Sequence, residues 1–293
     1  DGYDLTTEIT FDVVNGKVEN VQVGENNKNG YNETQNLITV FDDLKPGVTI
    51  SKQAVGGGEE LTGATLKLTG TNGEDLSKVT GSYGDGSTEG IDNSGTSISW
   101  TSDNAKGSVT LSKLPAGTYK LEEIPSPDGF TLKTEEMTFT VDSKGNVTTA
   151  SNLTKNDNGN GVIMEDEASS VSIVKVGKDG ESTKELPGAS MKLTYTGDAD
   201  LSKVTAENGE ITGNTEGSKE ITWTSGDKAV ELYDLPDGEY ILHEKTAPDG
   251  FTCITDFRFT ITDGKVTTTG TASVETEDAG LTVRDDASSV SLV

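Results

Sequence analysis

The chain repeats itself, and this repetition limits what it can fold into more than any other feature. The segment VTLSKLPAGTYKLEEIPSPDGFTLKTEEMTFTV at 109–141 returns as VELYDLPDGEYILHEKTAPDGFTCITDFRFTI at 230–261. LTGATLKLTG at 61–70 likewise returns as LPGASMKLTY at 186–195. Equivalent positions lie roughly 120 residues apart, which is a domain-sized period. The sequence therefore predicts a tandem array of similar domains.

Both ends of the chain contain parts of the same repeat. Residues 1–18 resemble the stretch that follows each Pro-Asp-Gly-Phe, and ITVFDD at 38–43 resembles LTVRDD at 281–286. We expect residues 1–46 to be the C-terminal half of a truncated repeat, completed by polypeptide outside the chain. The remaining expected parts are two complete repeats at 47–168 and 169–286, and the first strand of a following repeat at 287–293.

The apolar residues of each repeat follow the period of a β-strand. Val109 and Leu111 alternate with polar residues, as a strand with one buried face requires. Turn signals such as Asn15-Gly16 separate the alternating runs. Residues 74–79 are the one place where a short helix is expected. The sequence predicts an all-β fold of antiparallel β-sandwiches, Ig-like or prealbumin-like, arranged end to end.

Charge and composition exclude several classes of partner. The chain has 23 Lys and Arg against 50 Asp and Glu, which gives a net charge of −27. Such a charge repels nucleic acids and anionic membrane surfaces. No apolar run is long enough to span a membrane. The single cysteine, Cys253, and the single histidine, His243, exclude an intramolecular disulfide and a zinc cluster. We expect Cys253 to be a small core residue and His243 to be solvated.

Each complete repeat also places three charged side chains on faces that are otherwise apolar. Lys52 shares the face of Val48 and Ile50, and Glu123 shares the face of Tyr119 and Leu121. The full set is Lys52, Glu123 and Asp166 in the first complete repeat, and Lys175, Glu244 and Asp285 in the second. Asp42 has the same position in the half repeat. A buried charge without a partner costs several kcal/mol, so burial demands pairing or neutralisation. The alternative is that these residues cap strand ends in solvent.

The motif around the two glutamates resembles a known family. Tyr119-x-Leu121-x-Glu123, followed by Pro-Asp-Gly-Phe at 127–130, is similar to the E-box of collagen-adhesin B-type repeats and pilin shaft domains. Tyr240-x-Leu242-x-Glu244 and 248–251 repeat the arrangement. These domains occur on Gram-positive surface proteins and have a prealbumin-like β-sandwich fold. The resemblance covers essentially the whole chain when residues 1–46 count as a half copy.

This resemblance implies a self-formed isopeptide bond in each complete repeat. Carried over by position, Lys52 would join Asp166 beside Glu123, and Lys175 would join Asp285 beside Glu244. Asp42 would join a lysine outside the chain. Many relatives have Asn at the last-strand position, whereas Asp here implies loss of water.

General physical chemistry agrees with this implied bond. Burial lowers the pKa of an amine and raises that of a carboxylic acid, which favours a nucleophile beside a protonated carboxyl group. A nearby glutamic acid can then move the protons. The reaction is a single turnover on the protein itself, so the chain is not expected to be an enzyme.

The expected function is structural. The chain would be a stalk or shaft segment of an extracellular adhesin or fimbria on a bacterial cell wall, with neighbouring repeats or subunits of the same fibre as partners. The alternative is a module that binds a host matrix protein or glycan through the loop-rich stretches 71–99 and 196–222. A hydrolase is disfavoured because each carboxylate pair comes with a lysine.

No cofactor is expected, apart from a weak calcium alternative. Asn156, Asn158, Asn160 and Glu167 match the spacing of a calcium-binding loop. However, the first of these positions is Asn, where a calcium-binding loop normally has Asp, and calcium sites usually contain several carboxylates. An ordinary loop between strands is therefore the preferred interpretation.

Overall fold

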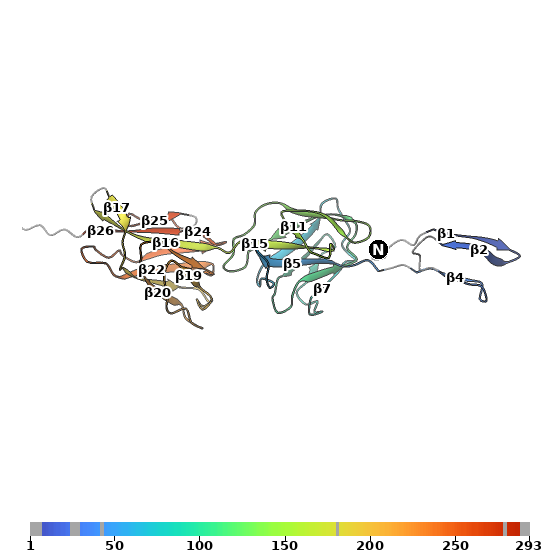
Figure 1. Ribbon diagram of the computed structural model, residues 1–293, viewed down its shortest axis with the longest axis horizontal. Coiled ribbons are helices and arrows are strands. Elements are labelled where there is room, and N and C mark those ends of the chain that lie inside the picture. Colours follow the sequence, from blue (N-terminus) through green and yellow to red (C-terminus); the bar gives the residue numbers. More distant parts are fainter. Residues whose placement is uncertain (1–7, 24–29, 42–43, 180–181, 278–279, 288–293) are drawn as a thin grey trace, which may run out of the picture. The chain divides into compact units, whose positions relative to one another are not determined.

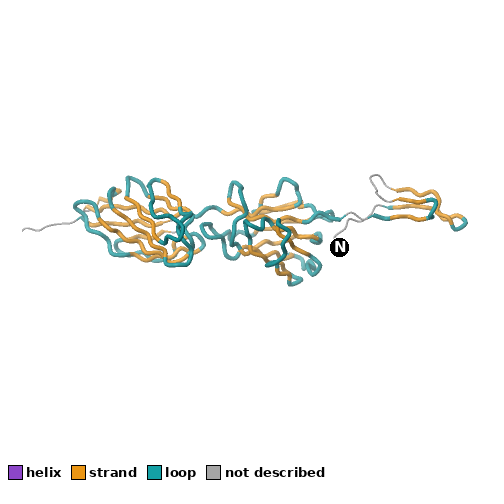
Figure 2. The backbone as a smooth tube through the Cα atoms, turned by 90° about the horizontal axis from the view of Figure 1, so that it is seen from below, coloured by secondary structure: helices purple, strands orange, loops and turns teal. Residues whose placement is uncertain are grey.

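The computed structural model describes residues 8–23, 30–41, 44–179, 182–277 and 280–287, and the regular structure in these ranges is entirely β (Figure 1, Figure 2). By its contacts the chain divides into two compact units, one comprising 1–53, 65–122 and 135–165, the other 54–64, 123–134 and 166–293. The boundaries expected from the repeats stay predictions. Among the described residues, no helix is long and apolar enough to cross a membrane.

The first complete repeat contains two sheets. One has the strand order β14 (Thr154–Lys155), β15 (Gly161–Asp166), β5 (Val48–Ala54), β10 (Val109–Ser112) and β7 (Thr80–Tyr83). The other has the order β13 (Val147–Ser151), β12 (Met137–Val141), β11 (Gly117–Glu123), β6 (Thr65–Gly70), β9 (Ser97–Thr101) and β8 (Asp92–Asn93). Side chains along most of β11, β12 and β15 alternate between buried and partly exposed, as the sequence pattern predicts, whereas β5 also buries Ser51 between Ile50 and Lys52.

The second complete repeat has the same two-sheet arrangement. One sheet has the order β19 (Thr205–Glu207), β21 (Val230–Tyr233), β16 (Ser170–Asp179), β26 (Gly280–Asp286) and β25 (Val274–Glu277), with β17 (Ser182–Glu185) also paired to β16. The other has the order β20 (Glu220–Thr224), β18 (Ser190–Tyr195), β22 (Gly238–Thr246), β23 (Phe257–Thr262) and β24 (Lys265–Val266). The all-β sandwich fold predicted from the alternating pattern is confirmed.

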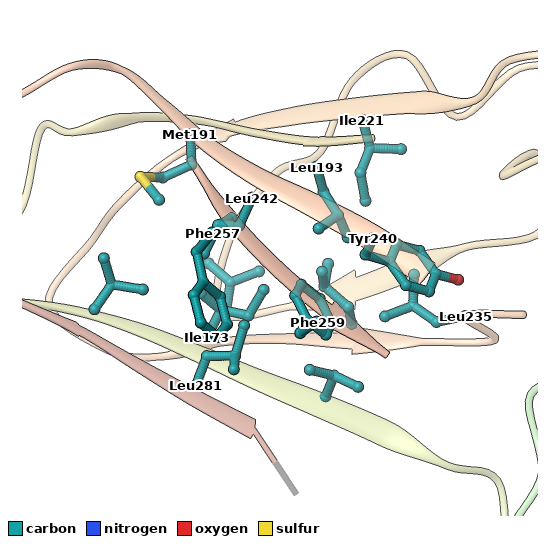
Figure 3. Close-up of a cluster of buried hydrophobic side chains, with 14 of the residues drawn as sticks. Ile173, Met191, Leu193, Ile221, Leu235, Tyr240, Leu242, Phe257, Phe259 and Leu281 are labelled. Atoms are coloured by element: carbon teal, nitrogen blue, oxygen red, sulfur yellow. The ribbon is translucent and has the colours of Figure 1, made fainter. Parts of the chain in front are cut away.

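The core of the second complete repeat lies between its two sheets. Figure 3 shows side chains of β22 and β23 facing Ile173 of β16 and Leu281 of β26 across this space. Tyr240 and Phe259 stack with ring centroids 5.4 Å apart. Trp223 is also buried in this cluster. Burial of apolar area at about 25 cal/mol per Å² is the main force that holds the sheets together.

Two details of the fold differ from the sequence-based expectations. The first and last strands of the second complete repeat, β16 and β26, pair in parallel, whereas antiparallel sandwiches were expected. The short helix expected at 74–79 is wrong, because these residues form a loop in which Leu76 and Val79 are buried. The Asn93 side chain donates hydrogen bonds to both of their carbonyl oxygens, at 2.8 and 2.9 Å. These bonds stabilise the non-helical conformation of the loop.

Residues 8–23 and 30–41 form two hairpins. The first joins β1 (Ile9–Val14) to β2 (Lys17–Val23), and the second joins β3 (Gly30–Asn32) to β4 (Leu37–Thr39). Each hairpin is a separate two-stranded sheet. Several of their large apolar side chains are exposed, including Phe11, Val13 and Val40.

Candidate functional site

The parallel pairing of β16 with β26 brings Lys175 and Asp285 onto one face of the sheet. Lys175 stands opposite Val283 in the register, and Gly177 stands opposite Asp285. Because side chains alternate along a strand, positions two apart share a face. Lys175 and Asp285 are therefore diagonal neighbours that both face the core, and Glu244 reaches them from β22 in the other sheet.

The three side chains meet in the interior. Lys175 Nζ lies 3.2 Å from Glu244 Oε2 and in direct contact with Asp285 Oδ1. The Lys175 side chain is 2% exposed, and the two carboxyl side chains are 0% exposed. One amine is thus held between two carboxyl groups where water does not reach. Placement of this kind can replace external activation in a bimolecular reaction.

The surroundings of Asp285 raise its pKa above that of an exposed aspartate. Burial raises the pKa of Asp285 to about 6, although the bonded Lys175 ammonium opposes the shift. The negative charge of nearby Glu244 acts in the same direction as burial on this pKa. A raised carboxyl pKa makes proton transfer from a neighbouring ammonium group less unfavourable than it is in water. The arrangement therefore brings a neutral amine–acid pair closer in free energy to the ion pair.

The position of Glu244 is fixed by the loop that follows β22. The backbone N–H of Ile254 donates a 2.9 Å hydrogen bond to Glu244 Oε2. This is the oxygen that contacts Lys175, so one backbone donor orients the carboxyl group toward the amine. The sequence offered no sign of this backbone contact.

The Pro-Asp-Gly-Phe segment holds the end of the last strand. Gly250 adopts φ +90°, a conformation that favours glycine, and the Phe251 N–H donates to the Pro248 carbonyl at 3.1 Å. Phe251 then forms an isolated β-bridge with Ala287, two residues beyond Asp285. The segment thereby anchors the chain just beyond Asp285.

Gly177 leaves space for the aromatic ring of this segment. A Cβ atom at Gly177 would lie 2.7 Å from Phe251 Cε1, so the ring occupies the place of a side chain. Since Gly177 stands opposite Asp285 in the register, the ring packs beside the position of Asp285. The tetrapeptide motif is the sequence signal for Phe251, whereas no motif marks Gly177.

The equivalent residues of the first complete repeat are also buried. Lys52, Glu123 and Asp166 are 0%, 4% and 0% exposed, and β15, which carries Asp166, lies beside β5, which carries Lys52. Each of the three makes polar or electrostatic contacts. Phe130 forms a β-bridge with Ala168, as Phe251 does with Ala287. These three residues therefore do not cap strand ends in solvent, which was the alternative interpretation. The roles of these residues in bond formation stay a prediction.

A tyrosine in each repeat fixes the turn before the glutamate strand. The Tyr240 hydroxyl donates to the Pro236 carbonyl at 2.6 Å, and the Tyr119 hydroxyl donates to the Pro115 carbonyl at 2.7 Å. Both side chains are 0% exposed. Sequence reasoning placed these tyrosines on the core face but did not foresee the bond.

The other predicted positions are not part of this site. Asp42 lies outside the described residues. In the loop predicted as a weak calcium alternative, the Asn156 amide donates to Asn160 Oδ1 at 3.4 Å, and the Asn160 amide donates to the Gly47 carbonyl at 3.1 Å. The Glu167 carbonyl accepts from the Thr131 N–H. In the described part of the chain, no group of three or more His, Cys, Asp or Glu residues is placed to hold a metal ion. Calcium binding stays untested.

The single cysteine and histidine lie at the surface. Cys253 was expected in the core but is exposed, because it lies in the loop between β22 and β23 and not on an alternating strand. The His243 side chain is 41% exposed and contacts Asp256 through Nδ1. Neither residue contacts the buried lysine and carboxylates.

Comparison with known proteins connects this geometry to a family. Structural likeness extends to the C-terminal fragment of the pilus adhesin SpaC from Lactobacillus rhamnosus GG, with 15% identity, TM-score 0.41, and coverage of 85% of this chain and 100% of that one. The Bacillus anthracis TIE protein is 18% identical with TM-score 0.39, covering 86% of this chain and 38% of that one. For the shaft pilin SpaA from Lactobacillus rhamnosus GG the identity is 14%, the TM-score 0.29, and the coverage 84% and 99%. No curated protein matches the chain.

A family model gives the decisive match. The model for the SpaA prealbumin-like fold domain matches residues 46–156 and again residues 169–277. These two matches cover most of the chain, and each includes all strands of one of the two sandwiches except the last strand, β15 or β26. The chain therefore belongs to the SpaA family of prealbumin-like fold domains.

Proposed function

We propose that each complete repeat closes an amide bond between its buried lysine and aspartate, and that the bonded repeats carry tension in a bacterial surface fibre. The observation that carries the proposal is the contact of Lys175 Nζ with both Asp285 and Glu244 in the sandwich interior. Lys52, Asp166 and Glu123 would act in the same way in the first complete repeat. Family membership and the resemblance to pilin shaft domains support the surface role.

The chemical step begins with a proton transfer inside the site. The Lys175 ammonium gives a proton to the Asp285 carboxylate, which leaves a neutral amine beside a carboxylic acid. Nζ then attacks Cγ of Asp285, and the Glu244 carboxyl group takes a proton from Nζ and gives one to the departing hydroxyl. The Cγ–N bond forms, a Cγ–O bond breaks and one water leaves. Glu244 ends in the protonation state in which it began.

Burial favours the product over the reactants. An ion pair in a dry interior loses its hydration, and its mutual attraction only partly compensates. The amide is uncharged, so bond formation removes the charges that burial destabilises. Proximity removes the entropic cost of bringing the groups together, which can account for roughly 7–11 kcal/mol of the barrier.

The bond would change how the domain bears force. Lys175 and Asp285 lie 110 residues apart in the sequence but on adjacent parallel strands. The amide bond would transmit a pulling force from the first strand directly to the last strand. The intervening strands would then remain folded under load. In a fibre, the neighbouring repeats or subunits would be the partners that apply this load, outside the cell.

Single-molecule pulling from the chain ends tests this function. In force–extension traces of the natural chain, no unfolding step should have the contour length of a complete repeat. In a chain with Glu244→Gln, the second complete repeat should unfold and release the 110 residues between Lys175 and Asp285, roughly 36–40 nm of contour. The matched substitution Glu123→Gln should free only the first complete repeat. Full unfolding steps in the natural chain would contradict the proposal.

A further inference from the structure

The hairpin of β1 and β2 has the sequence of a core hairpin in the second complete repeat. Residues 1–18 align without gaps to residues 249–266, which places Ile9, Phe11 and Val13 at the positions of Phe257, Phe259 and Ile261. ITVFDD at 38–43 aligns in the same way to 281–286, so Val40 corresponds to Val283.

These hairpins also have the register of their counterparts. Val13 pairs with Val18 and Val14 with Lys17, as Ile261 pairs with Val266 and Thr262 with Lys265. In the second hairpin, Tyr31 pairs with Ile38 where Thr276 pairs with Leu281. Residues 8–23 and 30–41 therefore build the same two hairpins as the back half of a complete repeat.

The difference between the copies is exposure. Phe259 is 1% exposed but Phe11 is 47% exposed. Ile261 and Val283 are 1% and 0% exposed, whereas their counterparts Val13 and Val40 are 64% and 53% exposed. Large apolar side chains gathered on exposed strand faces mark a surface that binds another polypeptide.

The complete repeat shows which elements cover this surface. There, β23 pairs with β24 along one edge and with β22 along the other. In the pairing with β22, Tyr240 stands opposite Phe259 and Leu242 opposite Phe257. In the same repeat β26 pairs in parallel with β16. Within the described residues, β1 pairs only with β2 and β4 only with β3, so the corresponding edges are open.

We propose that the faces of β1 and β4 dock the front half of a further repeat, a polypeptide with the strand pattern of residues 170–246. Its glutamate strand pairs antiparallel with β1, placing a tyrosine opposite Phe11, and its lysine strand pairs parallel with β4. The equivalent front halves at 47–123 and 170–246 already pair with β12, β15, β23 and β26 of their own repeats. A second copy of this chain therefore has no free front half to offer. The proposal does not depend on the covalent bond.

The test adds a third front half to the full chain. A copy of residues 169–248 is fused directly before Asp1, which restores the Pro-Asp-Gly order at the junction. Backbone hydrogen exchange is measured for residues 9–14 and 37–40 in the fused and unfused chains. We expect exchange at these amides to slow by roughly 100-fold or more in the fused chain, because strand pairing and burial protect amides.

Two control variants define what the result means. Changing Tyr240→Asp and Leu242→Asp in the added copy alone should abolish the protection, since those side chains face the docking surface. Changing Lys175→Ala in the added copy should leave the protection in place, which separates docking from any covalent bond. Unchanged exchange in the fused chain would overturn the proposal. So would protection that is already present in the unfused chain and rises with its concentration, because a second copy would then be the occupant.

Discussion

Replacing Glu244 by Gln should remove the proton shuttle while preserving the packing of the site. Glutamine has nearly the same shape, and its carbonyl oxygen can still accept the 2.9 Å hydrogen bond from the Ile254 N–H. It cannot exchange a proton with Lys175 and Asp285 at neutral pH. We therefore expect a folded second complete repeat without its Lys175–Asp285 bond.

The size of the effect follows from the loop that the bond closes. Lys175 and Asp285 are 110 residues apart, and closing a loop of that size in the unfolded chain contributes about 5 kcal/mol on the scale used for disulfides. A domain of roughly 120 residues unfolds with an entropy near 0.25 kcal/mol/K, so its transition should fall by roughly 20 °C.

Differential scanning calorimetry combined with intact mass measures both consequences. After the mass difference between Glu and Gln is allowed for, the Glu244→Gln chain should be one water heavier than the natural chain, and one of its two transitions should move down. Glu123→Gln is the matched control, because it should gain one water and move the other transition. A Glu244→Gln chain with unchanged mass would refute the role of Glu244. A heavier chain with an unchanged transition would refute the loop-closure estimate.

Three further substitutions or conditions probe the same site. Asp285→Asn should still form the bond but lose ammonia instead of water, and retention of the full mass would count against attack at this carbon. The pKa of Asp285 is raised to about 6 by burial, so the folded site holds an extra proton below that pH. The proposed amine–acid pair carries the same protons as the ion pair, whereas an extra proton on Asp285 leaves Lys175 as an ammonium group that cannot attack. Bond formation on refolding from urea should therefore slow as pH falls below about 6; a rate that keeps rising at lower pH would oppose this. Tyr240→Phe removes the hydrogen bond to the Pro236 carbonyl and should lower the free energy of unfolding by about 1–3 kcal/mol, with Tyr119→Phe as its counterpart. Denaturant unfolding that leaves both transitions unmoved would contradict it.

The sandwich fold could be predicted because its causes are local. Alternation along the strand of Tyr240 and Leu242 specifies one buried face, and the same alternation places Glu244 on that face. The repeat then supplies a second copy of each pattern. The burial of Lys175 and Asp285 follows from the same reasoning.

Other features depend on contacts that no local pattern contains. The parallel pairing of β16 with β26 depends on the path of the chain between these two strands. It does not depend on the residues of either strand. Residues 74–79 have the spacing of a helical turn, but Asn93 binds the carbonyl oxygens of Leu76 and Val79. The exposure of Phe11 is likewise absent from the local pattern. Its own sequence is that of a core strand.

The intact mass of the purified chain, followed by peptide mapping, tests the central claim most directly. If both complete repeats are bonded, the mass is lower than the sequence mass by two waters. Mapping then finds Lys52 joined to Asp166 and Lys175 joined to Asp285. A mass equal to that of the unmodified sequence would contradict the account of the buried lysines and aspartates as a reactive pair.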